Sequence, residues 1–300
     1  MSSVVAELEM NGQYGTAHVC GSVLRSVMAF GGEGLPVSGI TPLWLKAYEG
    51  YLLHKGGKGL AWNTVSTYMR MLQAVYNRAV VRKLAAFIPH QFRDVFTGRK
   101  ADHRRVLERD DMQKLLVERD PDITSPGMAW ARACLELMFR FHGMPFVDLA
   151  HLRKSDLKDG YLTLRRRKTG MPLSARVDGR AMQLLERYRN RDDTSPYLLC
   201  FLDGNLEGMA AYRDYQRILR LLNSRLRVLA LWKKVQGKVT SYSARHTWAT
   251  VGRYCHIPIE VISEGLGHAS VTTTEGYMKG FGNSRMDRAN KVIMNYIFKG

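Results

Sequence analysis

The sequence contains only four cysteines in 300 residues, and they stand far apart, at positions 20, 134, 200 and 255. Zinc sites and redox-active disulfides are typically built from cysteines a few residues apart, so neither is predicted. Stable disulfides are also typical of oxidising compartments. We therefore expect a reduced, cytoplasmic protein.

Long hydrophobic runs are absent as well. No stretch approaches the roughly 18 to 20 apolar residues of a membrane-spanning helix. The first residues, MSSVVAELEMNGQYGTAH, lack the basic and then apolar segments of a secretory signal. Repeats and low-complexity segments are absent too. These absences predict a soluble intracellular protein without a membrane partner.

Acidic side chains are scarce: 27 Asp and Glu residues stand against 45 Lys and Arg residues, which gives a formal net charge of +18. An excess of this size suggests a polyanionic partner whose counterions are released on binding. No acidic cluster typical of a catalytic metal is evident, and no metal or other cofactor is predicted. With 45% hydrophobic residues, the chain can form two domains with cores of their own.

Apolar residues at spacings of three and four predict helices in the first 96 residues. One helix covers residues 16–30. A second starts at Thr41 and Pro42, which are a favourable N-cap and first-turn pair. A third begins near residue 63, where Asn63 or Thr64 is the expected cap. The N-terminal part of the chain is therefore predicted to be a helical bundle.

The third helix carries arginines on its polar face, which is either a solvated surface or a DNA-binding one. Residues 97–105, TGRKADHRR, are basic and poor in apolar residues, which favours an interdomain linker that runs along phosphates. The candidate DNA-binding residues are Arg70, Arg78, Arg99, Lys100, Arg104 and Arg105. The chain would then contain a helical domain at 1–96, this linker, and a second domain at 106–300.

The second domain is predicted to combine helices with one small sheet. Apolar periodicity marks helices at residues 107–117, 126–141, 179–190 and 214–229, and from 243 to the end with breaks. Residues 160–177 alternate apolar and polar side chains on both sides of Lys168-Thr169-Gly170, which predicts a β-hairpin. The expected fold class is mainly α with a small antiparallel β-sheet.

Residue types suited to phosphate chemistry gather near the C-terminus. Ser-Ala-Arg-His-Thr contains Arg245, Leu-Gly-His contains His268, and Tyr277 follows that histidine by nine residues. An arginine fork and an imidazole can hold the negative charge that grows on a phosphodiester under attack. A phenol can attack the phosphorus and later leave again, although its pKa of about 10 requires cationic neighbours or a base.

These residues and their spacing resemble the catalytic box of the tyrosine recombinases, the phage-integrase family. The resemblance implies a SAM-like core-binding domain before the linker and a catalytic domain after it. It implies an enzyme that cleaves and rejoins specific DNA sites through a 3′-phosphotyrosyl bond at Tyr277, without ATP or metal. The implied partners are double-stranded DNA and a homotetramer on two DNA sites, with an accessory DNA-bending protein as a further candidate.

The resemblance also implies roles for single residues. Arg245 would clamp the phosphate, His268 would donate an N–H to it, and Lys168 at the hairpin tip would protonate the leaving 5′ oxygen. The arginines at 165–167 are neighbouring alternatives to this lysine. Tyr242 stands where most members carry a histidine, as in a branch of integrases from mobile elements, and a phenol there predicts weakened proton transfer.

The first catalytic arginine of the family has no direct counterpart here. Gapless alignment of FRFHGMPFVD puts Pro145 in its position, whereas the pattern of the mobile-element branch puts His142 there. Arg140 carries the nearest guanidinium, and we expect it to reach the phosphate with His142 as a neutral donor. Two other functions stay open: a type IB topoisomerase of the same chemistry, and a catalytically impaired DNA-binding relic. The C-terminal segment 286–298 would pack either on a neighbouring subunit or on its own core.

Overall fold

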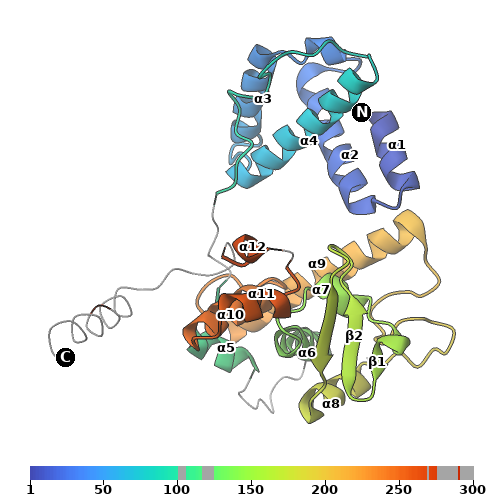
Figure 1. Cartoon of the computed structure of the whole chain (residues 1–300), viewed down its shortest axis with the longest axis vertical. Helices are drawn as coiled ribbons and strands as arrows, with labels where there is room; N and C mark the ends of the chain where they lie inside the picture. Colours follow the sequence, from blue (N-terminus) through green and yellow to red (C-terminus); the bar gives the residue numbers. More distant parts are fainter. Residues whose placement is uncertain (101–105, 117–124, 269, 276–289, 291–300) are drawn as a thin grey trace. The chain divides into compact units, whose positions relative to one another are not determined.

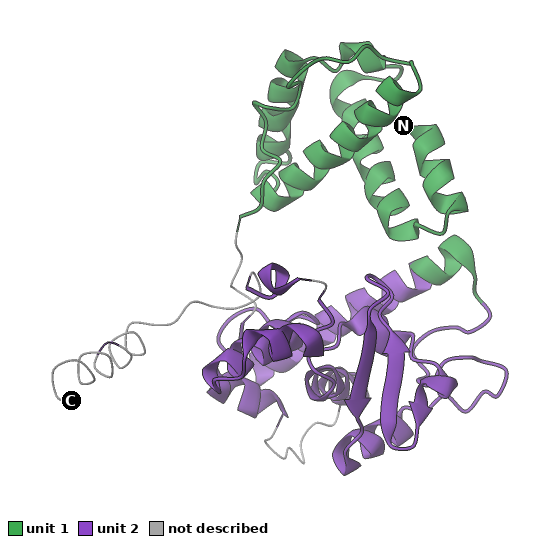
Figure 2. Ribbon diagram, viewed as in Figure 1, with its two compact units in different colours: residues 1–101, 206–212 green, residues 102–205, 213–300 purple. Residues whose placement is uncertain are grey.

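The computed structural model describes residues 1–100, 106–116, 125–268 and 270–275, together with residue 290. It divides into two compact units, residues 1–101 with 206–212 and residues 102–205 with 213–300 (Figure 2). The boundary after residue 101 falls within the segment predicted as a linker. Tyr277, Arg104, Arg105 and nearly all of the 286–298 segment lie outside the described residues.

The predicted fold class is confirmed, because the described chain is mainly helical and contains a small antiparallel sheet (Figure 1). The helices before residue 100 are α1 (Ser2–Met10), α2 (Tyr14–Gly31), the short η1 (Val37–Gly39), α3 (Pro42–His54) and α4 (Trp62–Val81). The later helices are α5 (Arg109–Leu116), α6 (Pro126–Arg140), α7 (Phe146–Ala150), η2 (Lys154–Asp156), α8 (Gly179–Arg187), α9 (Gly208–Trp232), α10 (Ser243–Tyr254), α11 (Ile259–Gly265) and α12 (Val271–Glu275). The strands are β1 (Leu157–Lys158), β2 (Tyr161–Arg165) and β3 (Pro172–Arg176).

The start of α3 follows its sequence signal. Thr41 has an extended backbone and its hydroxyl oxygen accepts a hydrogen bond from the Trp44 N–H at 3.2 Å, while Pro42 occupies the first turn. Leu45 and Leu52 are fully buried between α3 and its neighbours. The apolar stripe and the cap therefore act together to place this helix.

The start of α4 differs from the prediction. The N-cap is Ala61, which makes no side-chain cap, and the helix begins at Trp62. Asn63 instead makes two hydrogen bonds to the backbone of Lys100. Its side-chain oxygen accepts from the Lys100 N–H and its side-chain NH2 donates to the Lys100 carbonyl oxygen, each at 2.8 Å. A side chain that can cap a helix is here used to hold the beginning of the predicted linker against α4.

Two α-helices, α1 and α7, were not predicted. α1 has no side-chain cap, yet Val4 and Leu8 are buried in a small cluster with Ala17 and Cys20 of α2. α7 follows Pro145 and has only five residues. Helices this short are marginal by themselves, so packing and not local propensity determines them.

In the second unit, α6 is the central helix. Leu135, Leu137 and Met138 have no exposed surface, and α5, α7, α8 and α10 all pack against α6 (Figure 1). A helix buried on most of its sides accounts for the nearly continuous apolar run in its sequence. It places the turn after Arg140 next to the helix that carries Arg245.

The hairpin predicted around Lys168 is confirmed. The three strands are antiparallel in the order β1-β2-β3, and Leu164 pairs with Leu173 across β2 and β3. Leu162 is buried against the core, and side chains two residues apart on a strand share a face. The alternation therefore carries Arg166, just beyond β2, towards the interior.

Candidate active site

Arg245 is a fully buried guanidinium near the start of α10. Its side chain is 2% exposed. One terminal nitrogen, Nη1, donates to the Gly143 carbonyl oxygen at 3.1 Å, and the other, Nη2, donates to the Leu266 carbonyl oxygen at 2.7 Å. A buried charge is tolerated only when it is hydrogen-bonded in this way. The arginine is thus fixed between the turn after α6 and the turn after α11.

The turn after α6 is shaped for this contact. His142 and Gly143 both have positive φ angles, 56° and 67°. A Cβ atom on Gly143 would stand 2.9 Å from the Arg245 Cα, closer than real Cβ contacts come. Glycine is required here because the backbone of the turn has to approach α10 closely.

His268 lies directly beside Arg245. Its Nε2 is 2.7 Å from the Arg245 Nη2, and its Nδ1 is 2.8 Å from the Thr274 hydroxyl oxygen. Because a guanidinium only donates, Nε2 accepts, so the neutral ring carries its hydrogen on Nδ1 and donates it to Thr274. Burial, and then the charges of Arg245, Arg166 and Lys168, lower the pKa of His268 to about 4, so the ring is neutral at neutral pH.

This tautomer sets the direction in which the histidine donates. In the arrangement described, the N–H of His268 points to the Thr274 hydroxyl. The imidazole therefore orients Arg245 from one side and α12 from the other. Thr274 has no exposed surface, which makes this contact a fixed anchor for the helix that precedes Tyr277.

Arg166 is a second buried guanidinium, which the sequence indicated only as a neighbour of Lys168. Its side chain is 5% exposed, and Nε is 3.2 Å from a carboxylate oxygen of Asp148, itself buried. Nη1 donates to the Gly267 carbonyl at 2.9 Å and also to the Leu266 carbonyl. The alternation of β2, which places residues 162, 164 and 166 on one face, was the sequence signal that could have found it.

The two arginines meet at one atom, because both donate to the Leu266 carbonyl oxygen. Lys168, at the exposed tip of the hairpin, is near enough for its charge to lower the pKa of His268. Three cations, Arg245, Arg166 and Lys168, therefore lie around His268, and Asp148 pairs with Arg166. A cluster of this sign can stabilise the negative charge that develops on a phosphodiester during attack.

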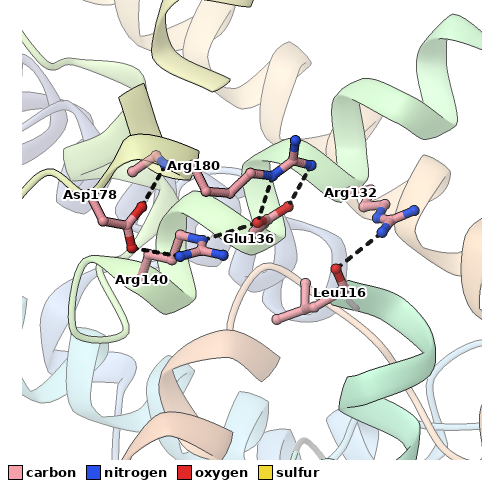
Figure 3. Close-up of polar contacts among 7 residues, drawn as sticks. Leu116, Arg132, Glu136, Arg140, Asp178 and Arg180 are labelled. Atoms are coloured by element: carbon pink, nitrogen blue, oxygen red, sulfur yellow. Dashed lines mark hydrogen bonds and ion pairs between the residues drawn. The ribbon is translucent and has the colours of Figure 1, made fainter. Parts of the chain in front are cut away.

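Arg140, the predicted second clamp, has other partners (Figure 3). Its Nε is 3.0 Å from Glu136 and its Nη1 is 2.6 Å from Asp178, so the side chain links α6 to the N-terminus of α8. Asp178 also accepts from the Ala181 N–H, and this bond and Arg140 lower its pKa. Arg180 binds Glu136 as well. The two carboxylate partners of Arg140 favour a structural role.

His142 and Tyr242 lie near the cluster in different ways. The His142 ring packs against Trp248 with 5.6 Å between ring centroids and lines a cavity of about 370 Å³ with Glu264 and Ser174. Burial lowers the pKa of His142. Tyr242 is the N-cap residue of α10, and its side chain is 42% exposed. An exposed phenol at this position is accessible to a bound polyanion.

The candidate DNA-binding residues are only partly available. Arg70 is exposed on α4, whereas Arg78 is 3.7 Å from Glu7 of α1 and is half-buried. Arg99 and Lys100 are exposed, and the Lys100 ammonium lies 4.4 Å from the Trp62 ring centroid. A further set of exposed arginines was not predicted. They are spaced seven apart on one face of α9 and are Arg213, Arg220 and Arg227.

Two further features bear on the class of protein. Within the described ranges, no group of three or more His, Cys, Asp or Glu side chains is arranged to hold a metal ion. None of the described helices combines the length and apolar character needed to cross a membrane.

Comparison with known protein families covers nearly the whole chain. A family described as the phage integrase SAM-like domain matches residues 1–93, and the phage integrase family matches residues 105–281. The tyrosine recombinase XerA of Pyrococcus furiosus is 29% identical over 140 residues, which are 46% of this chain and 46% of that protein. The aligned part of the chain thus spans less than half the length of this relative.

Solved structures show the same fold. A lambda integrase dimer bound to a COC′ core site matches with a TM-score of 0.64 at 17% identity, covering 89% of each chain. The Tn1549 transposon integrase in complex with transposon right end DNA matches with a TM-score of 0.60 at 16% identity, covering 92% of each chain. Since the phage integrase match spans more than half of the chain and includes Arg245 and His268, the protein belongs to the phage integrase family, the tyrosine recombinases.

Proposed function

We propose that the protein is a site-specific DNA recombinase that cleaves and rejoins DNA through a 3′-phosphotyrosyl intermediate at Tyr277. The observation that carries this proposal is the buried contact between Arg245 and His268, which is extended by Thr274 to α12. Three residues span at most about 11 Å, which bounds the length of chain between Thr274 and Tyr277. The nucleophile itself is assigned from its sequence position.

The charges of the cluster suit this reaction. Attack on a phosphodiester adds negative charge to the non-bridging oxygens, and fixed donors stabilise it most where water is excluded. Arg245 is charged at any accessible pH and is held by two carbonyls and a histidine. No magnesium or other cofactor is part of the proposal, since the cationic side chains take the charge-stabilising role that metal ions have in other phosphoryl-transfer enzymes.

In the proposed cleavage step, the Tyr277 oxygen bonds to phosphorus and the bond from phosphorus to the 5′ oxygen breaks. The Lys168 ammonium gives its proton to that 5′ oxygen, while the phenolic proton passes to solvent, from which the lysine is reprotonated. The 5′ hydroxyl of a partner strand reverses the step and restores the phenol. Because one phosphoester is exchanged for another, no ATP is needed.

We further propose that the partners are double-stranded DNA and three more copies of the chain, assembled on two DNA sites. The net charge of +18, the exposed arginines on α9 and the basic segment 97–105 support a polyanionic partner. The lambda integrase dimer on its core site supports binding as an oligomer. An accessory DNA-bending protein and a cytoplasmic location, where such an enzyme would meet its DNA, complete the proposal.

A nicked suicide substrate tests the function. When a nick lies just beyond the cleavage position, the short 5′-hydroxyl strand diffuses away and the covalent protein–DNA adduct accumulates. We expect an adduct that is stable to denaturant, and recombinant product when two sites are present. Failure to form any adduct on its cognate DNA would support the impaired relic, and an adduct that relaxes supercoiled DNA without joining two sites would support the topoisomerase.

Neutralising the linker should weaken binding to all DNA sequences alike. With glutamine at Arg99, Lys100, Arg104 and Arg105, the slope of log affinity against log salt should flatten by up to about 0.9 for each phosphate that the linker no longer neutralises. The measurement is a salt titration of binding on specific and random DNA. A variant with glutamine at Arg187 and Arg191, which are exposed in the second unit, controls for the loss of charge alone. An equal change of slope per charge removed in both variants would mean that the linker has no special role.

A further inference from the structure

The loop that carries Lys168 is closed tightly at its base. The Arg166 N–H donates to the Met171 carbonyl at 2.9 Å, and the Gly170 N–H donates to the Arg166 carbonyl at 2.8 Å. Residues 167–170 therefore form a short loop whose conformation depends on where the backbone of Arg166 is held. The exposed lysine side chain by itself has four rotatable bonds and no fixed direction.

Asp148 and Arg166 together fix this base. One carboxylate oxygen of Asp148 accepts from the Arg167 backbone N–H at 3.0 Å, and the other is 3.2 Å from the Arg166 Nε. Asp148 and Arg166 are 2% and 5% exposed, so the pair is shielded from water. A carboxylate on α7 thus binds both the backbone and the side chain at the foot of the hairpin loop.

The far end of the Arg166 side chain reaches the turn that leads into His268. Nη1 donates to the carbonyls of Leu266 and Gly267, about 100 residues further along the chain. Gly267 has a φ of 61°, and a Cβ atom there would stand 2.5 Å from the Arg166 Cδ. The turn and the arginine are therefore fitted to each other with no room for a side chain between them.

We infer that Arg166 is a positioning residue that locks the hairpin to the Leu266–His268 turn, so that Lys168 stands at the leaving 5′ oxygen when Arg245 holds the phosphate. The shared Leu266 carbonyl is the physical link, since it fixes the hairpin and the clamp relative to each other. Arg166 acts through Lys168 and does not itself touch the reacting atoms. The inference rests on the proposed function, in which Lys168 donates the proton as the bond from phosphorus to the 5′ oxygen breaks.

A substrate with sulfur in place of the bridging 5′ oxygen tests this inference. A thiol such as that of cysteine, with a pKa of about 8.5, is far more acidic than an alcohol, so a thiolate leaves without the proton that an alkoxide needs. Lys168→Ala should cleave the oxygen substrate slowly and the sulfur substrate at the rate of the unmodified protein. Arg166→Gln should show the same pattern, with a loss of about 100-fold on oxygen, on the scale expected for a misplaced catalytic group, and recovery on sulfur.

Control variants distinguish the positioning of Lys168 from loss of the phosphate clamp and from loss of one positive charge. Arg245→Ala should be slow on both substrates because it removes the clamp. Arg176→Gln removes an exposed arginine from β3 of the same hairpin, and it should cleave both substrates at the rate of the unmodified protein. Arg166→Lys keeps the charge but cannot span Asp148 and two carbonyls, so it should resemble Arg166→Gln, and it serves as the second variant if the glutamine protein does not fold.

Three results would overturn the inference: equal slowing of folded Arg166→Gln on both substrates, full oxygen cleavage by Arg166→Lys, or failure of sulfur to restore Lys168→Ala. Absence of any adduct from the unmodified protein on either substrate would instead reject the proposed function. The two failures are therefore distinguishable.

Discussion

Tyr277→Phe is expected to abolish the covalent protein–DNA adduct while DNA binding persists. The substitution removes only the phenolic oxygen, which is the atom that would bond to phosphorus, and leaves the ring and the surrounding charge unchanged. The measurement is adduct formation on the nicked substrate, together with a binding titration on intact DNA. The expected loss is complete because no other oxygen on this side chain can attack.

A tyrosine at the end of α10 supplies the matched control. Tyr254→Phe makes the same chemical change in a half-buried residue of the same unit and should leave the adduct yield unchanged. An adduct that survives in Tyr277→Phe would transfer the nucleophile to another residue and would reject the assignment made from spacing. Loss of the adduct in both variants would indicate a general effect on folding.

Arg245→Lys is expected to slow cleavage by about 100-fold or more, the scale seen when a donor to a developing oxyanion is removed. Lysine keeps the charge, but a single ammonium cannot reach the Gly143 carbonyl, the Leu266 carbonyl and the His268 ring together. Single-turnover cleavage rates measure the effect, and thermal melts confirm that the buried site still folds. Cleavage at the unmodified rate would show that the fork geometry of Arg245 is not needed.

Substitutions at Arg140 and His142 test whether either residue replaces the first catalytic arginine of the family. Because Arg140 is bound by Glu136 and Asp178, Arg140→Gln should lower stability by about 1 kcal/mol, allowing for its partial exposure, with cleavage largely retained. His142→Ala should also retain cleavage, since its ring packs on Trp248. A loss of about 100-fold in one of these variants, with folding intact, would make that residue the second clamp after all.

Features whose signals lie within a few neighbouring residues could be predicted from the sequence alone. Thr41 and Pro42 start α3 as predicted because cap and first turn are local interactions. The alternation around Lys168 predicted the hairpin because side chains on a strand alternate with a period of two residues. The predicted N-cap of α4 was wrong. Asn63 is hydrogen-bonded to Lys100, which lies 37 residues away and is outside the range of any local rule.

The spacing of Arg245, His268 and Tyr277 also indicated the family, and the phage integrase match over residues 105–281 includes all three positions. That Arg166 and not Arg140 lies beside Arg245 could be seen only in the folded chain, where Arg166 and Arg245 both donate to the Leu266 carbonyl. A guanidinium goes where buried acceptors are arranged around it. Arg140 meets Glu136 and Asp178, whereas Arg166 meets Asp148 and the Leu266 carbonyl. Those acceptors come from α7 and the turn after α11, so their distance from Arg166 is set by the packing of the whole domain and not by its neighbours in the chain.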